Sequence, residues 1–139
     1  MVFPKMSRYL PLAGGDTDFL EIETEERQEG LVVHVSGEVD LANVERFKAA
    51  IQPALSNRRN VILDVGNLRY IDSTGLHVLI DAHQGLQQHD CRLFVAGASP
   101  GIAKVMHILH LDRLMPLVSS VDEALGLIHK DSSAAASGG

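Results

Sequence analysis

Apolar residues recur along this chain in two alternating patterns, one typical of strands and one typical of helices. Phe19 and Ile22, together with neighbouring polar residues, predict a first strand through about residue 25, and the apolar, β-branched run at 31–36 predicts a second. A short polar turn separates the two, which predicts an antiparallel hairpin. The near-continuous apolar run at 61–65 predicts a strand that is covered on both faces. Residues 92–96 predict the next strand, and 115–118 predicts a short last strand. The pattern therefore predicts five strands.

Helical spacing appears between the later strands. Asp40 is expected to cap the first helix, in which Pro53 is expected to cause a kink or an early end. Ser99 followed by Pro100 marks the start of a later helix, and residues 120–123 form a capping-box pattern. The order ββαβαβαβα predicts an α/β domain with about four helices and a mixed, mostly parallel sheet that has an antiparallel N-terminal strand.

The expected core side of each helix is a stripe of apolar residues. These stripes are Val44, Phe47, Ile51 and Leu55; then Leu76, Leu79, Ile80 and Leu86; then Ile102, Val105, Met106 and Leu109; and finally Val121, Ala124, Leu125 and Ile128.

The two ends of the chain lack such patterns. Residues 1–15 contain two prolines and end in Ala-Gly-Gly, which is typical of a flexible leader. From residue 131 the sequence is rich in serine, alanine and glycine, and 131–139 is expected to be a disordered tail. One domain is therefore expected over residues 16–130.

Composition narrows the function classes. Of the 139 residues, 45% are hydrophobic and 4% aromatic, so the core must be aliphatic. The formal net charge of −6 argues against nucleic-acid binding, which requires a basic patch. Cys91 is the one cysteine and has no partner for an internal disulfide. With no signal-peptide pattern and no apolar run of membrane-spanning length, we expect a cytoplasmic protein that does not bind membranes.

Seven histidines raise the question of metal or acid–base chemistry. His77 and Asp81 are spaced to share a helix face, as are His107 and His110, but no further ligands of a zinc motif accompany them. The P-loop and the Gly-x-Ser-x-Gly elbow are absent as well. The sequence therefore predicts no metal, no cofactor and no catalytic set.

The remaining candidate is the run from Asp72 to Gly75, which follows a predicted strand and opens a helix. Asp, Ser and Thr at that point are ordinary helix caps, and Gly permits a tight turn. A phosphoryl group on Ser73 would, however, meet the positive end of a helix dipole and backbone N–H groups expected to be free. Because the Glu38–Asp40 loop also follows a strand, Asp40 could lie at the same edge of the sheet.

A stripe of small residues runs along the helix after Ser73. Gly75, Val78 and Ala82 share one face. Close packing against a neighbouring element explains such a stripe, and so does a flat docking surface beside Ser73. The spacing alone leaves both interpretations open.

Three motifs in this order resemble the anti-sigma factor antagonists, the bacterial STAS domain family. They are Gly-Glu-Val-Asp at 37–40, the apolar run at 61–65, and Tyr-Ile-Asp-Ser-Thr-Gly-Leu at 70–76. Segments 98–100 and 111–112 are similar too, and the likeness extends over about residues 16–130. It implies a single-domain STAS-like fold and a binding protein that regulates transcription, not an enzyme.

The resemblance also implies a mechanism of partner switching. Such proteins, when unphosphorylated, bind an anti-sigma factor that is a serine kinase with a histidine-kinase-like ATPase fold, and this frees a sigma factor. The phosphorylated serine maps to Ser73, and a PP2C-type phosphatase restores the binding state. Thr74 is a secondary candidate for the acceptor and is expected mainly to cap the helix. Asp40, Asp72 and Gly75 lie near that position, and His77, with Val78 beside it, stands where many relatives have a small residue.

Two other functions stay open from the sequence. A STAS domain can be a subunit of a lipid transporter or of a signalling scaffold, with the hydroxyls of 73–74 shaping a docking surface. A nucleotide hydrolase would have to rely on the carboxylates of Asp40, Asp64 and Asp72.

Overall fold

The structure, a computed structural model, describes residues 19–138, with side chains described through residue 131. The predicted leader at 1–15 lies outside this range. The elements in chain order are β1 (Leu20–Arg27), β2 (Gly30–Val39), α2 (Val44–Asn57), β3 (Val61–Ile71), α3 (Ser73–Gln87), β4 (Leu93–Ala96), α4 (Pro100–Ile108), the short 3-10 helix η1 (Leu111–Arg113), β5 (Leu117–Val118) and α5 (Val121–Gly138).

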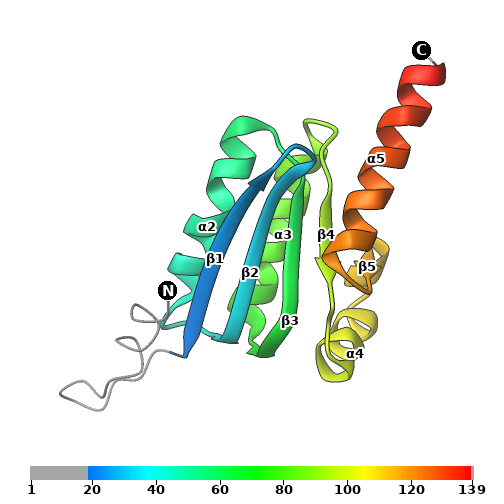
Figure 1. Ribbon diagram of the computed structural model, residues 1–139. Coiled ribbons are helices and arrows are strands. Elements are labelled where there is room, and N and C mark those ends of the chain that lie inside the picture. The colour runs from blue at the N-terminus through cyan, green and yellow to red at the C-terminus, as the bar shows by residue number, and fades with distance from the viewer. Residues whose placement is uncertain (1–18, 139) are drawn as a thin grey trace.

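The strands form one sheet in the order β1-β2-β3-β4-β5. The β1–β2 hairpin is antiparallel, and each later pair of strands is parallel. This confirms the predicted α/β architecture, because parallel neighbours need a crossover and each crossover here contains a helix. The carboxyl ends of β2 and β3 lie at the same end of the sheet, where α2 and α3 begin (Figure 1).

The two faces of the sheet are covered by different helices (Figure 1). The larger hydrophobic cluster joins β1–β4 to α2, α3 and α4, and its centre includes Phe47, Leu63 and Leu86. A smaller cluster on the other face joins Ile62 and Phe94 to α5. The aliphatic core expected from the composition is therefore split into two unequal layers.

Two strands are longer than the sequence predicts. β2 continues through Gly37–Val39 and β3 through residues 66–71, beyond the strand ends expected at residues 36 and 65. The extensions pair with each other, with register shifts between His34 and Ser36 and between Gly37 and Glu38. Glycine, asparagine and glutamate have low strand propensity, so the strand conformation of these extensions depends on cross-strand pairing and bulges.

The start and the course of α2 also differ from expectation. Asn43, not Asp40, occupies the N-cap position, and the helix runs through Pro53 without ending. Pro53 lies on the exposed side of α2, whereas the neighbouring Ile51 and Ala54 are buried against the sheet. Packing of that inner face holds the helix despite the backbone hydrogen bond that proline cannot make.

The later helices bring two further corrections. In α4, Ile102 and Met106 are buried, but Val105 and Leu109 are exposed, so half of the predicted apolar stripe faces outward. α5 continues to Gly138, beyond residue 131, where the sequence predicts a disordered tail. Alanine has the highest helix propensity, and a helix satisfies its own backbone without burying side chains. Within residues 19–138, no helix is both long and apolar enough to cross a bilayer.

Candidate functional site

The turn between β3 and α3 is organised by the side chain of Asp72. Asp72, one of the three residues expected to cap this helix, is the N-cap of α3, and its Oδ1 accepts the backbone N–H groups of Thr74 at 2.9 Å and Gly75 at 3.1 Å. The Thr74 hydroxyl donates to the same oxygen. Thr74 therefore supports the cap through Asp72 and does not itself cap the helix, which corrects the role expected for it.

Ser73 is the first residue of α3 and is exposed. Within residues 19–138 its hydroxyl has no hydrogen-bond partner, in contrast to the half-buried Thr74 hydroxyl. The backbone N–H groups of Thr74 and Gly75, expected to be free for a phosphoryl group, are already occupied by Asp72. A group added to Ser73 would therefore project outward from a turn whose donors are largely satisfied.

The loop between β2 and α2 is bonded directly to this turn. The Asp72 N–H donates to the Val39 carbonyl at 3.1 Å, and the Leu41 N–H donates to Asp72 Oδ2 at 3.2 Å. Asp40 closes the loop locally, since its Oδ1 accepts the Ala42 N–H at 3.0 Å. The expectation that the Asp40 loop and the Ser73 turn share one sheet edge is therefore confirmed.

The charge of the site is set by the same contacts. Hydrogen bonds from the Thr74 hydroxyl above all, and from the N–H groups of Gly75, Thr74 and Leu41, lower the pKa of Asp72 against the opposing effect of desolvation. Asp72 is therefore ionised at neutral pH and places a negative charge one residue before Ser73.

Gly75 lies where α3 makes its closest approach to the sheet. A Cβ at this position would come within 2.6 Å of Ile71 Cγ1 and 2.8 Å of Val39 Cγ1. Both side chains are buried, and both are β-branched with little freedom to move aside. Gly75 thus serves close packing, one of the two interpretations of the small-residue stripe.

The rest of that stripe borders an open groove between α2 and α3, with a volume of about 360 Å³. Val78 and Ala82 contribute to it from α3, and His77 is on its exposed rim. The sequence pattern does not predict that α2 and Leu41 form the other side of this groove. Leu41 is 74% exposed, and a large apolar residue directly after Asp40, in the turn before α2, was the available signal.

The histidines do not assemble a metal site. No group of three or more metal-ligating side chains is present among the residues that the structure describes. His77 lies 3.7 Å from Asp81, as its spacing predicts, whereas His107 bonds to Asp112 at 2.9 Å rather than facing His110. Asp64, the third carboxylate considered for catalysis, pairs with His34 in the sheet and not with the Ser73 turn.

A comparison with family models finds the STAS domain over residues 21–124. The chain belongs to the STAS domain family. An anti-sigma-B factor antagonist of Staphylococcus aureus is 31% identical over 97 residues, covering 69% of this chain and 90% of the relative. An anti-sigma F factor antagonist of Paenibacillus polymyxa is 26% identical over 108 residues, covering 76% of this chain and 92% of the relative. The predicted family resemblance is therefore confirmed.

Solved structures agree in fold. The crystal structure of an anti-sigma factor antagonist from Mycobacterium paratuberculosis matches with a TM-score of 0.72 and 23% identity, covering 79% of this chain and 94% of that one. The anti-sigma factor antagonist SpoIIAA in its unphosphorylated form matches with a TM-score of 0.70 and 22% identity, covering 79% and 97%. STAS anti-sigma factor antagonists are regulatory binding proteins without enzymatic activity.

Proposed function

We propose that this STAS domain is a cytoplasmic anti-sigma factor antagonist switched by phosphorylation of Ser73. Unphosphorylated, it binds an anti-sigma factor that is also a serine kinase and so frees a sigma factor for transcription. Phosphorylation of Ser73 by that kinase ends the binding, and a PP2C-type phosphatase restores it. Asp40, Asp72 and Thr74 are its proposed neighbours, Gly75 packs the turn beneath it, and His77 and Val78 continue the proposed contact surface along α3.

The difference between the two adjacent hydroxyls carries this proposal. Ser73 is exposed at the first position of α3 and has no partner among residues 19–138, whereas the Thr74 hydroxyl is held by Asp72. A kinase can reach Ser73 without breaking a hydrogen bond. Phosphorylation of Thr74 would remove a donor from the N-cap of α3, so the structure favours Ser73 over the secondary candidate.

Electrostatics supports release of the partner after phosphorylation. A phosphoserine carries a charge of about −1.5 to −2 at pH 7. It would stand beside the ionised Asp72, whose carboxylate already accepts the nearest N–H groups of the helix. Burying this extra charge in a tight interface costs several kcal/mol, or about a hundredfold or more in affinity. The switch then requires no refolding of the domain.

Phosphate transfer tests the acceptor directly. With ATP and the kinase recovered by pull-down from the native cytosol, we expect the wild-type chain to gain the mass of one phosphate, and Ser73→Ala to gain none. Thr74→Ala is the matched control and should still be phosphorylated. An unchanged gain in Ser73→Ala would exclude Ser73 as the main acceptor.

Binding tests the effect of the charge. Ser73→Glu should bind the kinase more weakly than Ser73→Gln, because the two side chains are similar in size and differ in charge. Equal affinities of these two variants would refute the electrostatic argument and leave the choice of acceptor standing.

A further inference from the structure

The groove between α2 and α3 is closed at one end and open at the other. A Cβ on Gly85 would come within 2.9 Å of Leu55 Cδ2, so the helices touch at the far end. At the other end the groove is bordered by Leu41 and Thr74, next to Ser73. From residue 44 to residue 55 the floor along α2 is about 16 Å long at the usual helical rise.

The groove has an apolar floor and a charged rim. Its floor consists of Val44, Ile51, Leu55, Val78 and Ala82. Glu45 and Asp81 stand on the rim, together with Lys48 and His77, and the Asp72 carboxylate lies at the open end. Carboxylates therefore outnumber permanent cations around this groove, which suits an occupant with apolar side chains and positive charges.

The chain itself supplies such a segment at residues 1–12. Its apolar members are Met1, Val2, Phe3, Met6, Tyr9, Leu10 and Leu12. Lys5 and Arg8 are its two charged side chains, and it contains no acidic residue.

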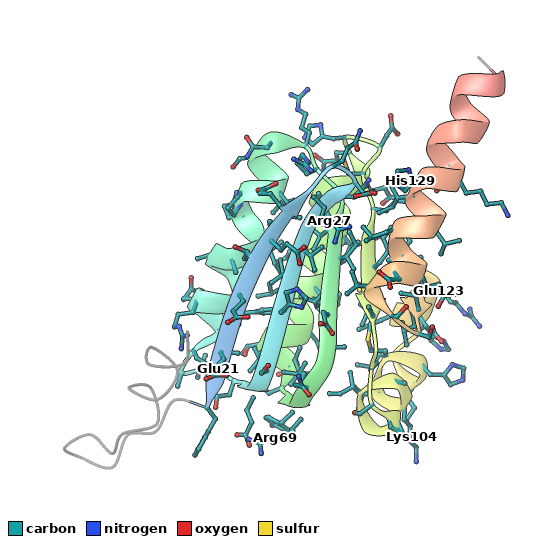
Figure 2. The ribbon with its side chains drawn as sticks, viewed as in Figure 1. Glu21, Arg27, Arg69, Lys104, Glu123 and His129 are labelled. Carbon is teal, nitrogen blue, oxygen red and sulfur yellow. The ribbon has the colours of Figure 1, made fainter. Side chains whose placement is uncertain are left out.

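The segment is attached at the open end of the groove. The Phe19 carbonyl accepts the Glu38 N–H at 3.2 Å, two residues before Asp40. Glu21 in β1 and Arg69 in β3 lie at this same end of the sheet, where α3 also begins (Figure 2). The connecting residues 13–18 can extend about 20 Å, and twelve more residues exceed the length of the groove. The segment can therefore reach and follow it.

We propose that residues 1–12 bind in the α2–α3 groove of their own chain, with Lys5 and Arg8 paired to the acidic rim. The short connection keeps the segment at a high effective concentration, so even a weak contact is populated. While bound, the segment lies beside Ser73 and competes with any partner that uses the same surface. The contact itself does not depend on phosphorylation of Ser73.

A spin label on the full chain tests this contact. Ser7→Cys in a Cys91→Ser background carries the nitroxide, and amide signals are compared before and after its reduction. We expect loss of signal intensity at groove residues such as Val78, Asp81 and Gln52. Amides of α5, on the opposite face of the sheet, serve as the internal control and should keep their intensity.

Charge reversal tests the pairing with the rim. Asp81 is exposed, so Asp81→Lys should leave the fold intact. This change should reduce the loss of signal intensity at the groove. Adding Lys5→Glu and Arg8→Glu to the same chain should restore the full loss of intensity. No loss at the groove, or equal loss across both faces, would refute the proposal. Signal loss that occurs only when spin-labelled chains are mixed with chains that lack the label would also refute it, and would assign the groove to a second copy. None of these outcomes affects the phosphorylation test of Ser73.

Discussion

Replacing Asp72 by alanine should lower the stability of the domain by about 2 kcal/mol. The change removes an N-cap acceptor used by Thr74 and Gly75, and losing such a cap costs about 1 kcal/mol. It also removes the acceptor of the Leu41 N–H, worth about 1 kcal/mol more. With a urea m-value of about 1.5 kcal/mol/M, the unfolding midpoint should fall by about 1.3 M.

Urea unfolding followed by circular dichroism at pH 7 measures this difference. Ser73→Ala is the matched control, because its hydroxyl has no partner among residues 19–138 and its loss should leave the midpoint nearly unchanged. Asp72→Asn keeps an acceptor oxygen at the N-cap but removes the negative charge, so it separates the contribution of the charge from that of the hydrogen bonds. Because the folded pKa of Asp72 is lowered, the contribution of its charge is present at neutral pH and lost as the pH falls through that folded value. An Asp72→Ala midpoint equal to that of Ser73→Ala would refute the proposed role of the cap.

Four further substitutions test the packing and the electrostatics of the domain by urea unfolding. Gly37→Ala should destabilise the domain strongly, by several kcal/mol. Gly37 has φ +98°, and a Cβ on it would lie 1.5 Å from the backbone oxygen of Phe19, just before β1. Gly75→Ala should lower the free energy of unfolding by about 1–3 kcal/mol through overpacking. Gly126→Ala is its control: a Cβ there has no atom within 4 Å and should stabilise α5 by up to about 1 kcal/mol. Equal effects of the two substitutions would refute the packing argument. Burial opposes charge on His34, but hydrogen bonds to two carboxylates outweigh it and raise its pKa. The stabilisation by protonated His34 should be complete below about pH 6.5 and disappear as the pH rises through the folded pKa. The urea midpoints measured at pH 5.5 and pH 8.5 should therefore differ less in His34→Gln than in the wild-type chain.

The sequence predicts the order of elements because local signals agree with the fold. Hairpin runs, buried strands and the Ser99–Pro100 start are properties of short windows, and each appears where expected. Asp72 as the cap of α3 is predictable for the same reason, since a cap is a contact between residues two or three apart.

What the sequence does not predict depends on residues far apart in the chain. The extension of β3 beyond Gly66 follows from pairing with β2, and the bond from Leu41 to Asp72 joins residues 31 positions apart. Neither contact leaves a periodic pattern in a local window. The same holds for His34, which bonds Asp64 on one neighbouring strand and Glu25 on the other.

The unequal covering of the sheet has a consequence for how the domain opens. α5 rests on the smaller cluster, and two side-chain pairs, Arg92 with Asp131 and His129 with Glu29, also connect it to the rest of the domain. Elements with few buried contacts exchange their amide hydrogens through local opening, at a lower free energy than global unfolding. Ser73, in contrast, is carried by α3, which packs into the larger cluster. Ser73, the proposed phosphorylation site, is therefore expected to stay in the closed part of the molecule when α5 opens locally.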